Sequence, residues 1–104
     1  MDRQVTLLLV EDDPEIRQAT SALVREHGFR VLAAEDGYEA IRALVDHQVD
    51  LLFTDIAMPG ISGVQLARQA KLMRGDLRVL YITGDAAQAS GKGILYGKLL
   101  QKPA

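Results

Sequence analysis

Short apolar runs alternate with longer amphipathic segments along this chain of 104 residues. The first run, residues 5–10, is apolar apart from Thr6 and stops abruptly at Glu11-Asp12-Asp13. Continuous apolar runs of this length are typical of strands in a parallel sheet, because helices cover both faces of such a sheet. The pattern therefore predicts that each apolar run is a buried strand and that each amphipathic segment is a covering helix.

Two helices are predicted from capping residues that precede apolar residues at helical spacing. Asp13 can cap the first helix, and Pro14 suits its first turn because proline lacks the N–H that this position leaves unbonded. The apolar repeat of this helix continues to about residue 27. The second helix begins around residues 36–39, Asp-Gly-Tyr-Glu, which resemble a capping box.

The second half of the chain repeats this alternation with weaker helical signals. Ser62 can cap a third helix, which Gly75 closes. Residues 85–97 contain several glycines, each of which costs a helix about 1 kcal/mol relative to alanine. We therefore expect only a short or irregular helix there. The remaining predicted strands cover residues 29–34, 51–55, 78–83 and 98–101.

Strands that alternate with helices predict an α/β fold in which helices cover both faces of a parallel sheet. A length of 104 residues and a hydrophobic content of 48% suit one domain, which we place over residues 1–104. Cysteine is absent, the formal net charge is −2, and the basic residues are scattered. No membrane span or signal peptide is recognisable. These features predict a cytoplasmic protein that binds neither nucleic acid nor a membrane.

Polar residues stand at the carboxyl ends of the predicted strands. Glu11 and Asp12 follow the first strand, Asp55 ends the third, Thr83 ends the fourth and Lys102 follows the fifth. These strand ends share one edge of a parallel sheet, where open α/β folds bind ligands. Three carboxylates brought together repel one another, so we expect a bound cation, and an all-oxygen ligand set favours Mg²⁺. A hydroxyl and an ammonium on the same edge favour a phosphoryl group.

The order of these residues resembles the receiver domain of two-component response regulators, including the receivers of hybrid sensor histidine kinases. The matching segments are residues 10–13, residues 54–60 with Gly63, Thr83-Gly84, and Lys102-Pro103. The resemblance covers nearly the whole chain. It implies a flavodoxin-like, doubly wound sheet of five parallel strands in the order 2-1-3-4-5, and a role in phosphorelay signal transduction.

The resemblance also implies how the phosphoryl group is handled. Asp55 accepts it from a phosphohistidine of a sensor histidine kinase or phosphotransfer domain. Thr83 hydrogen-bonds the phosphoryl group and Lys102 pairs with it, and phosphorylation alters the surface after the fourth strand. The domain is then a phosphoprotein that catalyses only its own phosphorylation and dephosphorylation, and is not an enzyme acting on other substrates.

For the metal, the resemblance implies that Asp12 and Asp55 coordinate Mg²⁺ together with the backbone carbonyl of Ala57. Glu11 acts mostly through water. A magnesium phosphohydrolase with an aspartyl nucleophile is an alternative, but its general acid is a second aspartate two residues after the nucleophile. That position is Ala57 here, which argues against this enzyme class.

Two features depart from the family pattern. Many receivers carry an aromatic residue three positions before the lysine, where this chain has Leu99, so Tyr81 or Tyr96 would have to take over its role. Only Pro103 and Ala104 follow the lysine, so a fifth helix is expected to be missing. The chain is then expected to be a fragment of a longer protein, or to cover the exposed face by dimerisation or with another subunit.

A second function remains open at this point. The chain could be a protein-interaction module that works without phosphorylation and whose acidic pocket is vestigial. The two hypotheses differ in whether the chain gains a phosphoryl group from a small phosphodonor.

Overall fold

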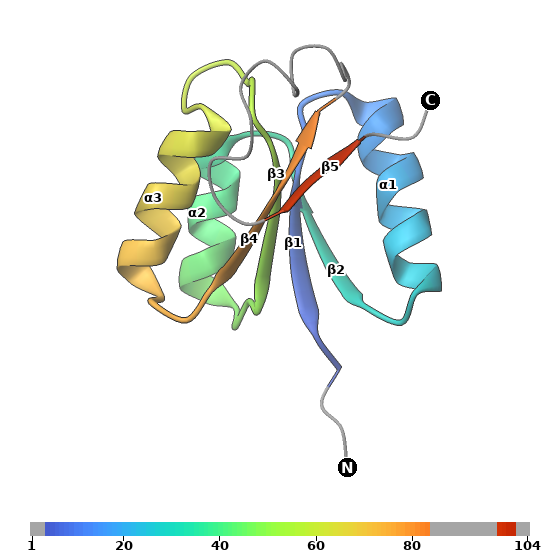
Figure 1. Ribbon diagram of the computed structural model, residues 1–104, viewed down its shortest axis with the longest axis horizontal. Helices are drawn as coiled ribbons and strands as arrows, with labels where there is room; N and C mark the ends of the chain where they lie inside the picture. The colour runs from blue at the N-terminus through green and yellow to red at the C-terminus, as the bar shows by residue number, and fades with distance from the viewer. Residues whose placement is uncertain (1–3, 84–97, 102–104) are drawn as a thin grey trace.

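The computed structural model describes residues 4–83 and 98–101, in which one layer of strands lies between two layers of helices (Figure 1). The alternation of strands and helices predicted from the sequence is confirmed for these residues. The irregular helix predicted over residues 85–97 lies outside them. In chain order the elements are β1 (Thr6–Val10), α1 (Pro14–Glu26), β2 (Arg30–Ala34), α2 (Gly37–Asp46), β3 (Leu51–Asp55), α3 (Gly63–Met73), β4 (Arg78–Thr83) and β5 (Lys98–Gln101).

All strand pairs of the sheet are parallel, and the strands lie in the order β2-β1-β3-β4-β5. The predicted α/β class is therefore confirmed. In the register of β1 with β3, Val10 lies opposite Thr54, so the next residues along the two segments, Glu11 and Asp55, lie near each other. The predicted absence of a fifth helix concerns the chain beyond Gln101, which lies outside the described residues, and it stays a prediction.

Alternate side chains of the strands bury two apolar clusters, one on each face of the sheet. On one face α2 packs against β2 and β1 and α3 packs against β3, and on the other face α1 packs against β1 and β2 (Figure 1). The first cluster is built around Leu8, Leu52, Leu44, Leu66 and Tyr81. The second is built around Leu7, Leu9, Phe53, Val24 and Val31. Burial on both faces explains why the strands read as unbroken apolar runs.

Helix α1 begins as its sequence predicts. The Asp13 side chain accepts hydrogen bonds from the backbone N–H groups of Glu15 (2.9 Å) and Ile16 (3.2 Å), and Pro14 occupies the first turn. The cap satisfies donors that a helix start otherwise leaves unbonded. It also fixes where the loop after β1 must end.

The capping box predicted at the start of α2 forms only in part. The Asp36 side chain accepts from the Glu39 N–H at 2.8 Å, but the Glu39 carboxylate reaches back to the N–H of Glu35 (3.0 Å). The complete box is at α3. There Ser62 accepts from the N–H of Gln65, whose side chain in turn accepts from the Ser62 N–H.

The end of α3 differs slightly from its prediction. The helix stops at Met73 and the backbone is already extended at Arg74, so Gly75 lies beyond the cap. The Arg74 guanidinium donates to the carbonyls of Leu44 (2.9 Å) and His47 (3.0 Å) at the end of α2. These bonds join the ends of the two helices that cover the same face of the sheet.

None of the helices within the described residues has both the length and the apolar character that a membrane span requires.

Candidate functional site

The loop after β1 places three consecutive acidic residues in different environments. The Glu11 side chain is 1% exposed, its backbone N–H donates to the carbonyl of Ala34 on β2 (3.1 Å), and its Oε2 accepts from the N–H of Asp13 (3.0 Å). Asp12 and Asp13 are both exposed, but the Asp13 side chain accepts the capping bonds of α1. Glu11 therefore anchors the loop, Asp13 caps the helix, and Asp12 is the exposed carboxylate that the cap does not use.

Asp55 is the last residue of β3 and is only 7% exposed. Its Oδ1 accepts a hydrogen bond from the backbone N–H of Ala57 at 3.3 Å. The backbone behind it is packed against the start of α3, because Gly63 donates its N–H to the carbonyl of Ile56 at 2.8 Å. A β-carbon at Gly63 would overlap the backbone of Asp55 and Ile56, so this close approach requires glycine.

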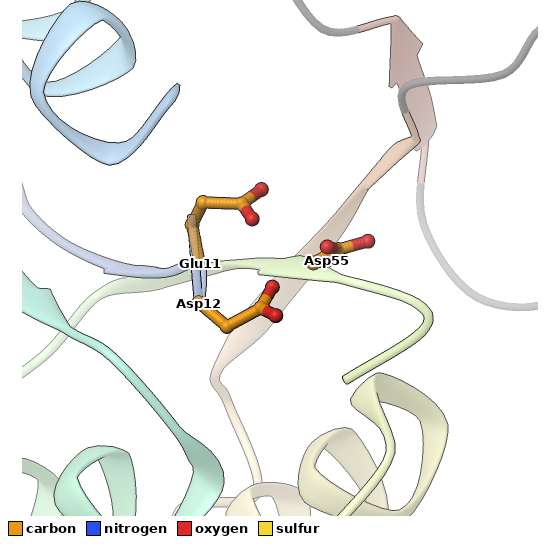
Figure 2. Close-up of side chains that lie close together, drawn as sticks. All are labelled: Glu11, Asp12 and Asp55. Carbon is orange, nitrogen blue, oxygen red and sulfur yellow. The ribbon is translucent and has the colours of Figure 1, made fainter. Parts of the chain in front are cut away.

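The carboxylates of Glu11, Asp12 and Asp55 meet at the carboxyl ends of β1 and β3. Figure 2 shows the first two extending from the end of β1 toward Asp55, and one oxygen from each residue lies within 4.8 Å of the others. Two of the three are buried, which is unfavourable for carboxylates unless a positive charge balances them. An oxygen-only donor set from two strand ends fits a hard divalent cation such as Mg²⁺.

The structure places the other predicted site residues less completely. Ala57 contacts Asp55 through its backbone N–H, while the metal-binding role of its carbonyl stays a prediction. Thr83 ends β4 at the same edge of the sheet, in register with Gln101 on β5. Lys102 lies outside the described residues.

The structure also bears on the position that many receivers fill with an aromatic residue. Leu99 on β5 pairs in register with Tyr81 on β4. Tyr81 is 1% exposed and belongs to the apolar cluster beneath α2 and α3, so it is a core residue. Tyr96, the other candidate for an aromatic switch, lies outside the described residues.

One residue near the site was not predicted from the sequence. Arg17, on the second turn of α1, donates from Nη1 to the backbone carbonyl of Glu11 at 2.8 Å. A basic residue one turn after the cap of α1 lies within reach of the acidic loop, and this spacing is the signal in the sequence. The acceptor is a main-chain atom, however, and sequence alone does not reveal which carbonyl a side chain will meet.

A hollow of about 1160 Å³ lies at the opposite end of the sheet, where β3 and β4 begin. Leu51, Leu77 and Arg78 contribute to its lining, and none of the clustered carboxylates does. The acidic cluster is therefore separate from this cavity.

Comparison with known proteins agrees with this fold. The profile of the response regulator receiver domain matches residues 7–98. The chain is 37% identical over 83 residues to the response regulator receiver protein CpdR of Brucella abortus, an alignment that covers 80% of this chain and 69% of CpdR. It is 36% identical to the C4-dicarboxylate transport transcriptional regulatory protein DctD of Pseudomonas aeruginosa over 80% of this chain but only 18% of DctD.

Among solved structures, the response regulator protein TrrA of Thermotoga maritima superposes with a TM-score of 0.83 at 28% identity. The match covers 96% of this chain and 88% of TrrA, whose structure was determined in complex with Mg²⁺-BeF. The chain therefore belongs to the family of response regulator receiver domains of two-component signalling, as its sequence predicted. Receiver domains of this family interact with histidine kinases or phosphotransfer partners.

Proposed function

We propose that this chain is a phosphoacceptor domain in which Asp55 receives a phosphoryl group from the phosphohistidine of a sensor histidine kinase or phosphotransfer domain. The observation that carries the proposal is the convergence of Glu11, Asp12 and Asp55 at the ends of two adjacent parallel strands, within 4.8 Å of one another. Membership of the receiver family supports the same chemistry.

In the proposed step, a carboxylate oxygen of Asp55 attacks the phosphorus atom of the phosphohistidine. The new O–P bond forms as the P–N bond breaks, and the imidazole nitrogen of the donor keeps the electron pair. The N–H of Ala57 holds Asp55 Oδ1, which limits rotation of the nucleophilic carboxylate. Because phosphoryl transfer depends mainly on positioning, this restraint favours an in-line approach of the donor.

The proposed Mg²⁺ ligands are the carboxylates of Asp12 and Asp55 and the backbone carbonyl of Ala57, with Glu11 acting through water. The ion, when bound, neutralises charge on the phosphoryl oxygens. The Mg²⁺-containing complex of TrrA, a similar protein, supports this assignment. The buried Glu11 accepts a hydrogen bond from the N–H of Asp13, which suits a residue that holds the loop in place and does not bind the ion directly.

On the other side of the phosphoryl group, we propose that Thr83 donates a hydrogen bond to it and that Lys102 pairs with its charge. A phosphoryl group brings roughly −2 of charge to the end of β3. Movement of the Thr83 hydroxyl toward this charge would alter the surface that follows β4. The domain then acts as a switch that catalyses only its own phosphorylation and dephosphorylation.

The identity of the protein that responds to phosphorylation of this domain is a separate question from the chemistry of the site. The chain matches less than a quarter of DctD, so the output of such relatives does not transfer to it. The predicted hybrid-kinase context, the covering partner and the cytoplasmic location all remain proposals.

The test is to incubate the chain with a small phosphodonor and Mg²⁺ and then measure its intact mass. We expect one added phosphoryl group that is labile in acid and absent from Asp55→Asn. Omission of Mg²⁺ should slow the gain strongly. A wild-type chain that binds Mg²⁺ but gains no phosphoryl group would instead support the vestigial module.

A further inference from the structure

The loop after β1, which carries Glu11 and Asp12, is held to helix α1 by the side chain of Arg17. Arg17 Nη1 donates to the backbone carbonyl of Glu11 at 2.8 Å, and the Arg17 side chain is half-buried. We infer that Arg17 is a positioning residue that holds the Asp12 carboxylate where Mg²⁺ binds. This inference rests on the proposed function.

The peptide unit between Glu11 and Asp12 explains how Arg17 acts. The carbonyl of Glu11 and the N–H of Asp12 belong to one rigid plane, so a donor fixed on that carbonyl restrains the rotation of the whole plane. The rotation of this plane determines the direction in which the Asp12 side chain leaves the backbone. A bond from a guanidinium to a carbonyl is charge-assisted and therefore stronger than a bond between neutral groups.

Asp12 depends on this restraint more than its two neighbours in the cluster do. Glu11 Oε2 is held by the N–H of Asp13, and Asp55 Oδ1 is held by the N–H of Ala57. Within residues 4–83 and 98–101, the exposed Asp12 carboxylate accepts no hydrogen bond. Its place in the cluster is therefore determined by the backbone, and Arg17 holds that backbone from the helix side.

The charge of Arg17 would act on Mg²⁺ in the opposite direction. A cation beside the cluster repels a divalent ion, so an Arg17 that acted only through charge would weaken Mg²⁺ binding, and its removal would strengthen it. An Arg17 that acts by positioning strengthens Mg²⁺ binding, and its removal weakens it. The sign of the change in Mg²⁺ affinity therefore separates the two effects.

The experiment compares Mg²⁺ affinity, measured by isothermal titration calorimetry, for the wild type, Arg17→Met, Arg17→Lys and Arg25→Met. Methionine keeps an unbranched apolar stem but removes the donors and the charge, whereas lysine keeps a donor group and the charge. Arg25 lies on the same helix, is exposed, and makes no side-chain hydrogen bond within the described residues, so Arg25→Met controls for a lost positive charge.

We expect Arg17→Met to weaken Mg²⁺ binding about tenfold, in the range seen when residues that orient metal ligands are removed. Arg17→Lys should recover most of the affinity, and Arg25→Met should match the wild type. Unchanged or tighter binding by Arg17→Met would overturn the inference. So would an equal loss in Arg25→Met.

A second readout needs no metal. Amide hydrogen exchange in metal-free protein should be faster at Asp13 in Arg17→Met, because its N–H bonds to Glu11 within the loop that Arg17 restrains. The N–H of Ala57, which belongs to the loop after β3, should exchange at the wild-type rate. Equal exchange at Asp13 in both proteins would contradict the positioning role.

The two proposals fail in different ways. If the wild type takes up no Mg²⁺ and no phosphoryl group, the proposed function fails and the inference fails with it. If the wild type does both and Arg17→Met binds Mg²⁺ as well as the wild type, only the role of Arg17 is wrong.

Discussion

Replacement of Gly63 by alanine tests the contact that fixes the backbone of Asp55. Gly63 is the first residue of α3, and a β-carbon placed on it would lie 2.9 Å from both the carbonyl carbon of Asp55 and the Cα of Ile56. Its approach to the carbonyl oxygen of Asp55 would be closer still. All of these atoms are backbone, so no side-chain rotation can relieve the overlap.

The size of the effect follows from this geometry. Ordinary contacts of a β-carbon begin near 3.4 Å, so α3 or the end of β3 must withdraw by about half an ångström to relieve the two carbon contacts and by more to clear the carbonyl oxygen of Asp55. Overpacking of this kind costs about 1 to 3 kcal/mol in well-packed proteins. The withdrawal also stretches the bond from the Gly63 N–H to the Ile56 carbonyl, now 2.8 Å. We therefore expect Gly63→Ala to lower the free energy of unfolding by about 2 kcal/mol.

Urea unfolding followed by circular dichroism measures this loss. With a slope of about 1 to 3 kcal/mol per molar urea, 2 kcal/mol shifts the midpoint by about 1 M. Gly75→Ala is the matched control, because Gly75 has no atom within 4 Å of its β-carbon position and its φ is not positive. This variant should be as stable as the wild type or slightly more stable. Equal midpoints for Gly63→Ala and Gly75→Ala would refute the packing argument.

Further urea-unfolding predictions follow from single hydrogen bonds. Ser62→Ala removes one of the two bonds of the capping box, the one from the Gln65 N–H to the Ser62 hydroxyl, and should lower the free energy of unfolding by about 1 kcal/mol; an unchanged midpoint would mean that this bond contributes nothing. The Thr20 hydroxyl is buried without a hydrogen-bond partner among the described residues, so Thr20→Val should raise stability by about 1 kcal/mol. Thr54→Val deletes a 3.1 Å bond from the Thr54 hydroxyl to the Asp55 carbonyl and should therefore lower the free energy of unfolding. A Thr54→Val protein more stable than the wild type would contradict this comparison.

The features that sequence predicted well are those that depend on local chemistry. The strand ends at Val10 and Asp55 coincide with abrupt changes from apolar to acidic residues, and burial on both faces makes these changes sharp. The start of α1 was equally clear, because a capping residue and a proline act within their own turn. The convergence of Glu11, Asp12 and Asp55 followed from parallel topology alone.

The features that sequence did not predict depend on contacts between distant segments or on competing local bonds. The side chain of Glu39 bonds to Glu35 instead of Asp36, a choice between adjacent donors that residue types do not determine. The bonds from Arg74 to the end of α2 join residues about thirty positions apart, so they exist only once α2 and α3 have packed. Arg17 was missed because its acceptor is a backbone carbonyl in the loop before its helix.

The central claim, that Asp55 is the phosphoacceptor, is tested most directly by locating the modified residue. The chain is incubated with a small phosphodonor and Mg²⁺, the acyl phosphate is reduced with borohydride to an alcohol, and the peptides are sequenced by mass spectrometry. The account predicts that homoserine replaces aspartate at position 55 and at no other position. Modification at Glu11 or Asp12, or the absence of any modification in protein that binds Mg²⁺, would contradict it.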